Sequence, residues 1–448
     1  MTDKKLILVV IDGLTPEVFE DAVETEYAPA LAFLARNGSY RRGTSTFPSL
    51  TPVCLSSIAT GAHPDVHRIP HLVWWNRDER RLVEYGSSFA AIRAAGTRRS
   101  FLDAVFNMNE QHLGRDAVTL YEGLEDAGRP TAAVNITCYR GRTPHLPLVP
   151  GFTRPAFGPK EFFFYSLFES EVTGAPVAVF GRSTGSIDAY AAYVGRWLVT
   201  RDGFDLLVYY LPDYDFASHA RGPGGTQEAL ARSDAAVGAL IEAGGGPDEF
   251  LERYAVVVCS DHGQTLVERA VSLEASFADV DGVLVTASNR AGMVYCLDGC
   301  REDVDELARR LDGSPAAEVV LYRDGDEAVA RRGREELRFA PAAGAWRTSG
   351  DPTLLDQPDA LERCWAALAN PNAGELIVSP PLGVELTDLA GRSHLGGGSH
   401  GSLEAGDSTV PILTVGLDAE GEARRIVDIA PLALEHFGVK LPAYADAA

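Results

Sequence analysis

The sequence predicts an α/β fold in which a largely parallel central sheet is covered by helices on both faces. Short apolar runs of five or six residues, bounded by turn residues, alternate along the chain with longer segments of helical periodicity. Several of these runs are apolar throughout, which is typical of strands buried on both faces. Because helices connect parallel strands, the alternation predicts a three-layer αβα sandwich.

The expected elements follow one another from the N-terminus to the C-terminus. The strands are residues 6–11, 132–136, 206–211, 255–259, 292–297 and 411–415. The helices are residues 28–36, 117–126, 187–199, 226–242, 303–311 and 427–437. The segment from about 299 to 373 is rich in charged and turn residues. We therefore expect a single catalytic domain over 1–448 with a smaller lobe inserted at about 299–373.

The composition is that of a folded protein with a sizeable core. The chain has 448 residues, of which 46% are hydrophobic and 23% charged. Its net charge of -23, from 63 acidic and 40 basic residues, opposes binding to a nucleic-acid backbone or an anionic membrane. We expect a small-molecule substrate and no stable nucleic-acid partner.

The chain shows no segment of transmembrane length. The apolar run 6–11 is too short to cross a bilayer, and no small-residue cleavage site follows it. The six cysteines are sparse, and only Cys296 and Cys300 lie close together, which favours reduced thiols over a zinc or disulfide framework. These observations predict a cytosolic protein without membrane insertion, and they leave the oligomeric state undecided.

Acidic residues follow three of the expected strands. Asp12 follows 6–11, Asp213 and Asp215 follow 206–211, and Asp261 with His262 follows 255–259. Open α/β sheets carry their chemistry beyond the carboxyl ends of the strands. One such aspartate would be ordinary turn chemistry, but three at one edge indicate a site.

Histidines with metal-ligand spacing accompany these carboxylates. Asp215 and His219 are four residues apart and would share one face of a helix. His400 lies in a glycine-rich segment that lets backbone approach a crowded centre. Three carboxylates and three imidazoles would hold two divalent ions with open positions for substrate, with zinc the best match and manganese or iron next. The predicted ligands are Asp12, Asp215, His219, Asp261, His262 and His400.

A hydroxyl at a helix start is the expected nucleophile, because backbone N–H groups there stabilise phosphoryl oxygens. Thr51 fits as an N-cap followed by Pro52, with a helix over 53–60 that Gly61 ends. The alternative is that Thr51 is only an N-cap. The other hydroxyls nearby, which spacing does not exclude, are Thr46, Ser49, Ser56 and Ser57.

Taken together, the motifs resemble the alkaline phosphatase superfamily, and more narrowly its type I phosphodiesterase and nucleotide pyrophosphatase branch. The motifs are VVIDG (9–13), STFPSLTP (45–52), ATGAHPDVH (59–67), LPDYDFASHARGP (211–223), CSDHGQ (259–264), GGSHG (397–401) and VPILTVG (410–416). The resemblance implies an alkaline-phosphatase-like fold and two zinc ions. It implies that one ion is held by Asp12, Asp261 and His262, and the other by Asp215, His219 and His400. It further implies attack by Thr51 on phosphorus, followed by hydrolysis of the phospho-threonine or nucleotidyl-threonine.

Two departures from the branch bear on the substrate. Ungapped matching places Leu72 where the branch has an asparagine that holds a phosphoryl oxygen, and the nearby alternatives are Asn76, His71 and Arg68. Trp74 and Trp75 could form a stacking platform for an aromatic group or could be packing residues. The aromatic run 162–165 could line a pocket for an apolar group or could likewise be packing.

The motifs also bear on other functions of the same superfamily. A sulfatase would need a cysteine or serine in a C-x-P-x-R-like setting, which 54–58 does not offer, and the serine nucleophile of a cofactor-independent phosphoglycerate mutase is absent at position 51. A phosphomonoesterase or a phosphonate hydrolase is the main alternative to a phosphodiesterase. The non-enzymatic alternative is a metal-stabilised binding protein.

Overall fold

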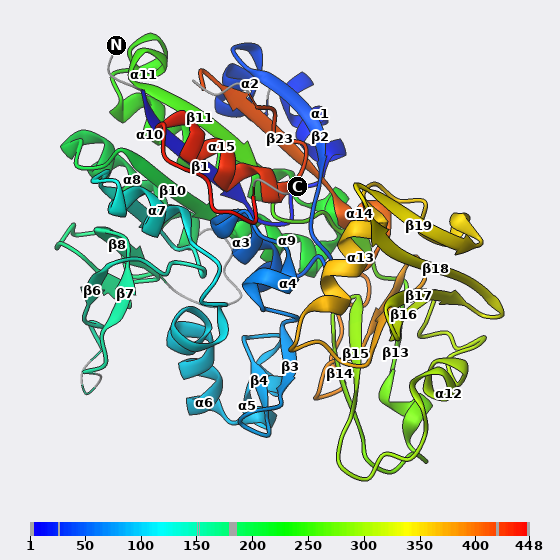
Figure 1. The fold of residues 1–448 in the computed structure, drawn as a ribbon. Coiled ribbons are helices and arrows are strands. Elements are labelled where there is room, and N and C mark those ends of the chain that lie inside the picture. The colour runs from blue at the N-terminus through cyan, green and yellow to red at the C-terminus, as the bar shows by residue number, and fades with distance from the viewer. Residues whose placement is uncertain are drawn as a thin grey trace.

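The computed structural model describes residues 4–25, 27–149, 151, 153–178, 186–417 and 421–445. They form two large sheets with helices around them (Figure 1). The first sheet has eight strands. In spatial order these are β2 (Ser39–Thr44), β23 (Thr409–Val415), β11 (Tyr254–Cys259), β1 (Lys5–Ile11), β10 (Leu206–Leu211), β5 (Thr131–Val134), β8 (Glu161–Phe164) and β9 (Phe168–Glu169).

The centre of this sheet is parallel and fully buried. Strands β11, β1, β10, β5 and β8 pair in parallel, whereas β23, β2 and β9 are antiparallel at the edges. Every residue of β1 from Leu6 to Ile11 is buried, which explains why the run is apolar at every position. The strands expected at 6–11, 132–136, 206–211, 255–259 and 411–415 are therefore confirmed, with ends that differ by a few residues.

Two groups of helices pack against this sheet, and the predicted three-layer α/β fold with a largely parallel central sheet is confirmed. In one group, α10 packs against α8 and α2; in the other, α3 packs against α7 and α15. The first group is α1 (Pro16–Glu24), α2 (Pro29–Arg36), α8 (Ser186–Arg201), α9 (Asp213–Arg221), α10 (Gln227–Ala243) and α11 (Pro247–Arg253). The second is α3 (Thr51–Thr60), α7 (Leu120–Asp126) and α15 (Ile429–His436), which the 3-10 turn Ile426–Asp428 precedes.

The second large sheet is antiparallel throughout and has seven strands. Their order is β14 (Val283–Ser288), β15 (Ala291–Cys296), β20 (Leu376–Ser379), β16 (Val319–Asp324), β17 (Glu327–Arg332), β18 (Glu335–Ala342) and β19 (Ala345–Gly350). Helices α12 (Val304–Arg309) and α13 (Ala360–Ala369) pack against β16.

The strand expected at 292–297 exists as β15, but its assignment to the parallel sheet was wrong. It follows β14 after a two-residue turn, and such a short connection joins only antiparallel strands. The second sheet extends from Val283 to Ser379, so the expected insertion at about 299–373 falls within it, and the division into domains remains a prediction.

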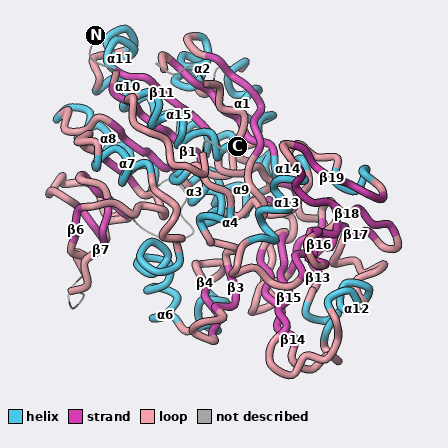
Figure 2. Tube along the Cα trace, viewed as in Figure 1, coloured by secondary structure: helices cyan, strands magenta, loops and turns pink. Residues whose placement is uncertain are grey.

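Short elements fill the space around the two sheets (Figure 2). No helix among the described ranges is long and apolar enough to cross a membrane. The hairpins and strand pairs are β3 (Val73–Asn76) with β4 (Arg81–Glu84), β6 (Thr143–His145) with β7 (Ala156–Gly158), β12 (Thr265–Leu266) with β22 (Gly398–Ser399), and β13 (Arg269–Val271) with β21 (Val384–Leu386). The short helices are α4 (Pro64–His67), α5 (Phe89–Ala95), α6 (Thr97–Leu102), the π-helix Asp103–His112 and α14 (Ala405–Ser408).

Candidate active site

The ends of three neighbouring parallel strands bring the predicted acidic residues together. Strand β1 pairs in register with β10 and β11 almost to its last residue, so the carboxyl ends of the three strands lie side by side at one end of the sheet. The pairing of β12 with β22 then brings the His400 segment beside the loop after β11. Next to these carboxyl ends lie Asp12 after β1, Asp215 in the first turn of α9, and Asp261 with His262 after β11.

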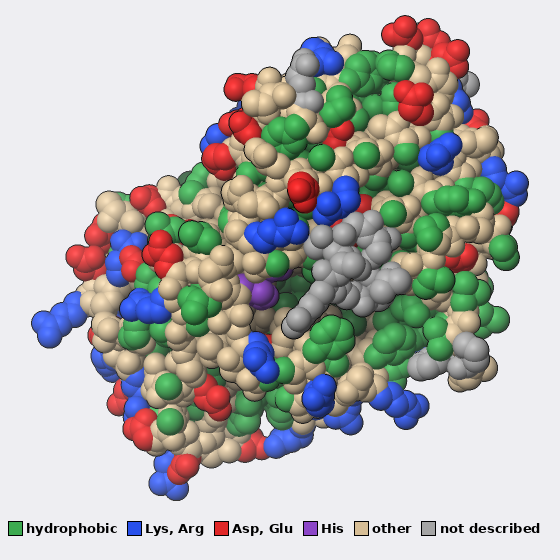
Figure 3. Space-filling model, turned by 180° about the vertical axis from the view of Figure 1, so that it is seen from behind, with side chains coloured by type: hydrophobic (Ala, Val, Ile, Leu, Met, Phe, Trp, Pro, Cys, Tyr) green, Lys and Arg blue, Asp and Glu red, His purple; other side chains and the backbone are tan. Residues whose placement is uncertain are grey.

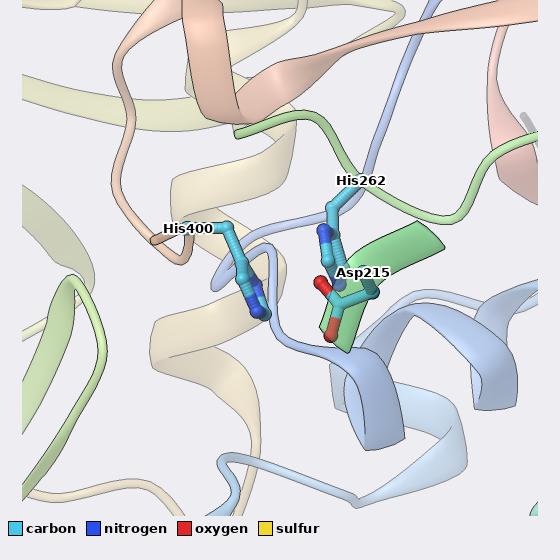
Figure 4. A group of neighbouring side chains, drawn as sticks. All are labelled: Asp215, His262 and His400. Carbon is cyan, nitrogen blue, oxygen red and sulfur yellow. The ribbon is translucent and has the colours of Figure 1, made fainter. Parts of the chain in front are cut away.

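Two overlapping groups of buried side chains here have the spacing of metal ligands. The ligand atoms of Asp12, Asp261 and His262 lie within 4.8 Å of one another, and so do those of Asp215, His262 and His400. Figure 4 shows that the three side chains of the second group reach the same space from three separate segments. His262 belongs to both groups and therefore lies between them.

The three histidines are held by the same kind of hydrogen bond. In each ring Nδ1–H donates to a backbone carbonyl oxygen, so Nε2 is the nitrogen left for other partners. This orientation is the usual one for metal-binding histidines, because the carbonyl fixes both the ring and the tautomer. The hydrogen bonds run from His219 to Gly398 (2.8 Å), from His262 to Gly263 (3.0 Å) and from His400 to Ser49 (2.8 Å).

Two carboxylate oxygens in the first group have no hydrogen-bond donor among the described residues. They are Oδ1 of Asp12 and Oδ2 of Asp261, and both are buried. A buried carboxylate oxygen without a partner is costly, and a bound cation is a common way to satisfy it. The nearest positive group is Nε2 of His262, at 3.2 Å from Asp12 and 3.5 Å from Asp261. The donor set therefore fits a divalent ion.

The electrostatics of the first group also favour bound positive charge. Burial and the neighbouring Asp12 carboxylate raise the pKa of Asp261 well above its usual range. Burial opposes protonation of His262, but the carboxylates of Asp261 and Asp12 outweigh it and raise the pKa of His262 to about 10. The same negative surroundings would hold a metal ion at Nε2 of His262.

Asp215 and His219 meet on one face of α9, as their spacing predicts. Nε2 of His219 lies 3.2 Å from Oδ2 of Asp215. Although burial raises the pKa of Asp215, the charge of His219 and its hydrogen bond lower it below its usual range. The other carboxylate oxygen accepts a hydrogen bond from the side-chain amide of Gln264, which also accepts one from Ser218. Asp215 is thus fixed from both sides.

Thr51 lies beside the first group of carboxylates. Its Oγ1 is 3.1 Å from Nε2 of His262. The predicted N-cap role of Thr51 is wrong, because the extended residue before the helix is Leu50, and Thr51 is already helical and makes no capping hydrogen bond. The N–H groups of Val53 and Cys54 both donate to the carbonyl of Leu50, so the first turn does not offer a row of free amides.

The other candidate hydroxyls make hydrogen bonds away from these carboxylates. Ser49 donates to the carbonyl of Ser402 (3.2 Å) and Ser56 to that of Pro52 (2.7 Å), while Ser57 and Thr46 lie near His67 (3.2 Å) and His63 (3.5 Å). Only Thr51, among these five, contacts a predicted metal ligand through its hydroxyl.

One face of the molecule shows a hollow with a histidine side chain at its floor (Figure 3). Several Lys and Arg side chains stand around this hollow, although the chain as a whole is strongly acidic. Basic side chains around a recess make the local potential more positive than the net charge of the chain, because nearby charges dominate the field at close range.

The sequence profile of the type I phosphodiesterase/nucleotide pyrophosphatase family matches residues 6–403. This chain belongs to that family. Its members are phosphoric ester hydrolases, and the predicted resemblance and enzyme class are thereby confirmed. No curated protein sequence matches the chain.

Solved structures share the fold of this phosphodiesterase-family chain at low sequence identity. Phosphonoacetate hydrolase from Sinorhizobium meliloti 1021, in complex with phosphonoformate, has 18% identity and a TM-score of 0.65 over 97% of this chain and 96% of that one. Murine ectonucleotide pyrophosphatase/phosphodiesterase 5 has 14% identity and a TM-score of 0.62 over 98% and 96%. An inactive variant of the murine protein was solved in complex with AMP at the same similarity.

Three residues considered as replacements for the family's phosphoryl-binding asparagine make their contacts elsewhere. Arg68 pairs with Asp116, and Asn76 bonds to Glu79. Both ring nitrogens of His71 are used by backbone groups. Each of the three side chains is therefore engaged by another group in this structure.

The aromatic residues of this family member support packing rather than a stacking platform. Trp74 is 1% exposed and lies in the core beside the second sheet, and the run 162–165 is buried in the core of the first. Trp75 is partly buried and packs against the second-sheet core. The packing interpretation is confirmed for Trp74 and for 162–165.

Sequence reasoning missed several residues that surround the family's expected ligands. The Tyr210 hydroxyl donates to Asp12, Gln264 donates to Asp215, and the Asn289 amide lies 2.9 Å from Nε2 of His400. His394 stacks on His219 with ring centroids 4.0 Å apart. Only Gln264 carried a local signal, because it ends the CSDHGQ motif; the others are brought in by tertiary structure.

Proposed function

We propose that this chain is a two-metal phosphodiesterase or nucleotide pyrophosphatase in which Thr51 is the nucleophile. The single observation that carries the proposal is the arrangement around His262, where a hydroxyl at a helix start and two buried carboxylate oxygens, neither with a hydrogen-bond donor among the described residues, converge on one nitrogen. The ligands would be Asp12, Asp261 and His262 for one ion, and Asp215, His219 and His400 for the other.

The chain's own residues would perform two tasks. Thr51 presents Oγ1 from the rigid first turn of α3, so that an Oγ1–P bond forms as the bond from phosphorus to the leaving oxygen breaks. A water then attacks the phosphorus, the Oγ1–P bond breaks, the phosphate product leaves, and a proton from the water restores the Thr51 hydroxyl. Tyr210 and Gln264 hold the carboxylates of Asp12 and Asp215 in place. Bound divalent ions would supply the charge that stabilises the attacking and leaving oxygens.

The ligand chemistry supports zinc, with manganese or iron as the other candidates. Mixed carboxylate and imidazole donors are typical of catalytic zinc sites. The proposed number is two ions per chain, because six ligands give each ion three protein donors and leave positions for substrate.

The expected substrate is a small phosphodiester or nucleotide pyrophosphate. Arg290, the cation that directly follows Asn289, is buried and paired with Asp407, so it does not reach out to a dianionic phosphate. A monoester or a phosphonate is the alternative. The phosphonate alternative is supported by the fold similarity to a phosphonoacetate hydrolase, because an enzyme of this fold cleaves a phosphonate.

A parallel assay tests the proposal. The purified chain is stripped of metal and reloaded with zinc or manganese. It should then hydrolyse bis(p-nitrophenyl) phosphate with a higher kcat/KM than p-nitrophenyl phosphate. Hydrolysis of ATP to AMP and cleavage of phosphonoacetate are measured in parallel. A higher kcat/KM for the monoester or the phosphonate would reassign the substrate. If none of the four compounds is cleaved in a metal-dependent way, the alternative function, a metal-stabilised binding protein without turnover, would be favoured.

Thr51 variants test the nucleophile. Thr51→Ala should lose at least about 10³-fold in kcat and keep its ions, whereas Thr51→Ser should retain measurable activity because its hydroxyl survives. Since Thr51 does not cap α3, the alanine variant should change the free energy of unfolding by no more than about 1 kcal/mol. A Thr51→Ala variant with wild-type turnover would show that Thr51 is not the nucleophile and would favour a bound water in that role.

A cytosolic location is part of the proposal. Its support is that all six cysteines are free thiols, four of them buried, and disulfide-free chains are typical of reducing compartments.

A further inference from the structure

The tip of a hairpin from the second sheet enters the candidate active site. Strands β14 and β15 are joined by the two-residue turn Asn289–Arg290, closed by the pairing of Ser288 with Ala291. Asn289 is 6% exposed, and its side-chain amide nitrogen lies 2.9 Å from Nε2 of His400. Because Nδ1–H of His400 donates to Ser49, Nε2 is an acceptor, and this settles that the amide nitrogen rather than the amide oxygen faces the ring.

The backbone at Asn289 is held in a conformation that favours glycine. Its φ is +56°, in the left-handed region that costs energy for residues with a Cβ. At such a hairpin position glycine, asparagine and aspartate are the usual residues, and of these glycine bears no strain. An asparagine here retains a side chain where the fold alone requires none.

The turn is also fixed on both sides, so the amide is pre-positioned. The carbonyl of Asn289 accepts from the N–H of Leu386 (2.8 Å), and the N–H of Arg290 donates to the carbonyl of His400 (2.7 Å). The guanidinium of Arg290 is fully buried and donates to the Asp407 carboxylate (2.6 Å). A donor held this firmly loses little freedom when it binds a ligand.

We infer that Asn289 is a substrate-binding residue whose side-chain amide donates a hydrogen bond to a non-bridging phosphoryl oxygen. This inference rests on the proposed function, because that function assigns the Nε2 lone pair of His400 to an ion. With an ion on Nε2, the amide nitrogen of Asn289 has no other hydrogen-bond acceptor among the residues that the structure describes, and an unpaired buried donor is costly. A phosphoryl oxygen bound at the same ion is the acceptor that fits.

The substrate class follows from the chemistry of this donor. A carboxamide is neutral and directional, so it positions an oxygen of a phosphodiester monoanion without supplying the charge that a dianion needs. Asn289 thus provides the type of group that the family places elsewhere, at the position that Leu72 occupies in this chain.

Two variants separate this role from a structural one. Asn289→Gly removes the amide and also removes the left-handed strain, so the turn itself is retained. Asn289→Asp keeps the shape and replaces a donor with an anion. Asp202→Gly is the matched control, because Asp202 also has a left-handed φ of +58° but lies before β10, at the opposite end of the strand from the site.

Three quantities are measured for each variant: the affinity for inorganic phosphate, the metal content and the turnover of the diester. For Asn289→Gly we expect both ions to remain, phosphate to bind about 10-fold more weakly by calorimetry, and kcat/KM for the diester to fall about 10²-fold. Asn289→Asp should bind phosphate still more weakly through repulsion, and Asp202→Gly should match the wild type.

The contrary outcomes are distinct. Loss of one ion from Asn289→Gly would make Asn289 a metal ligand through its oxygen, and unchanged phosphate binding and turnover would make it a structural turn residue; either result overturns the inference. Phosphate binding that depends on Asn289 in a protein that hydrolyses no phosphate ester would instead reject the proposed function and retain the inferred contact.

Discussion

Replacement of Gly13 by alanine should damage the site through two separable effects. Gly13 follows Asp12 and has a φ of +70°. A Cβ at this position would lie 2.7 Å from the amide nitrogen of Gln264 and 2.8 Å from Oδ1 of Asp215, closer than a Cβ atom approaches other heavy atoms. The substitution therefore combines backbone strain with displacement of the hydrogen bond that fixes Asp215.

The magnitudes follow from these contacts. The left-handed backbone alone should cost about 1 to 2 kcal/mol with alanine. Disruption of the buried hydrogen bond from Gln264 to a carboxylate should add about 1.5 to 3 kcal/mol. Gly438 has a φ of +63° and open space around its Cβ direction, so Gly438→Ala isolates the backbone cost and serves as the control.

Chemical denaturation and elemental analysis measure the two effects. Gly438→Ala should lose about 1 to 2 kcal/mol of unfolding free energy and keep its activity. Gly13→Ala should lose about 2.5 to 5 kcal/mol and about 10²-fold in turnover, because a ligand displaced by a fraction of an ångström misplaces the reacting atoms. Equal losses of stability in the two variants, with full metal content and activity in Gly13→Ala, would refute this account of the contact.

Three further measurements probe the same structure. Zinc at 100 times its Kd should raise the free energy of unfolding by about 2.7 kcal/mol per site, and chelation should reverse this; Asp12→Ala and Asp215→Ala should each lose one ion, and two ions in both variants would contradict the assignment. The buried ring of His71 has a pKa lowered to about 4, chiefly by burial, so its contribution to stability is present above about pH 6.5 and is lost as the pH falls to about 4. His71→Gln should therefore flatten the acid side of the stability curve by about 1.4 kcal/mol per pH unit, and an unchanged slope would contradict it. All six thiols should react with Ellman's reagent in denaturant without reductant, whereas four or fewer would show a disulfide.

Much of the site could be predicted from the sequence because it depends on local rules. Buried parallel strands are apolar at every position, and the polar residues that follow each strand lie at the same carboxyl end of the sheet. Asp12, Asp215 and Asp261 obey this rule, and the i, i+4 spacing of Asp215 and His219 follows from helix geometry alone. These placements need no knowledge of distant contacts.

The parts that could not be predicted depend on contacts between distant segments. Asn289 and His400 are 111 residues apart, and Tyr210 and Asp12 are 198 apart. The start of α3 was misjudged for a related reason. Thr51-Pro52 has the composition of a cap and first turn, but Leu50 takes the extended conformation, and the Thr51 hydroxyl turns to His262 instead of to the helix backbone.

A buried ion pair explains why the second sheet can hold Asn289 so firmly against the first. The Asp407 carboxylate accepts from Arg290 in the hairpin turn, from the Thr265 hydroxyl in β12, and from the N–H and hydroxyl of Ser402 just after His400. Both charged partners are fully buried, so removal of either one would leave an uncompensated charge and cost about 3 to 5 kcal/mol. An apolar pair could pack as well, but it could not bond to three segments at once. The ion pair therefore fixes the position of the hairpin relative to the His400 loop, and a hydrogen-bond donor at the hairpin tip needs that fixed position to meet a phosphoryl oxygen.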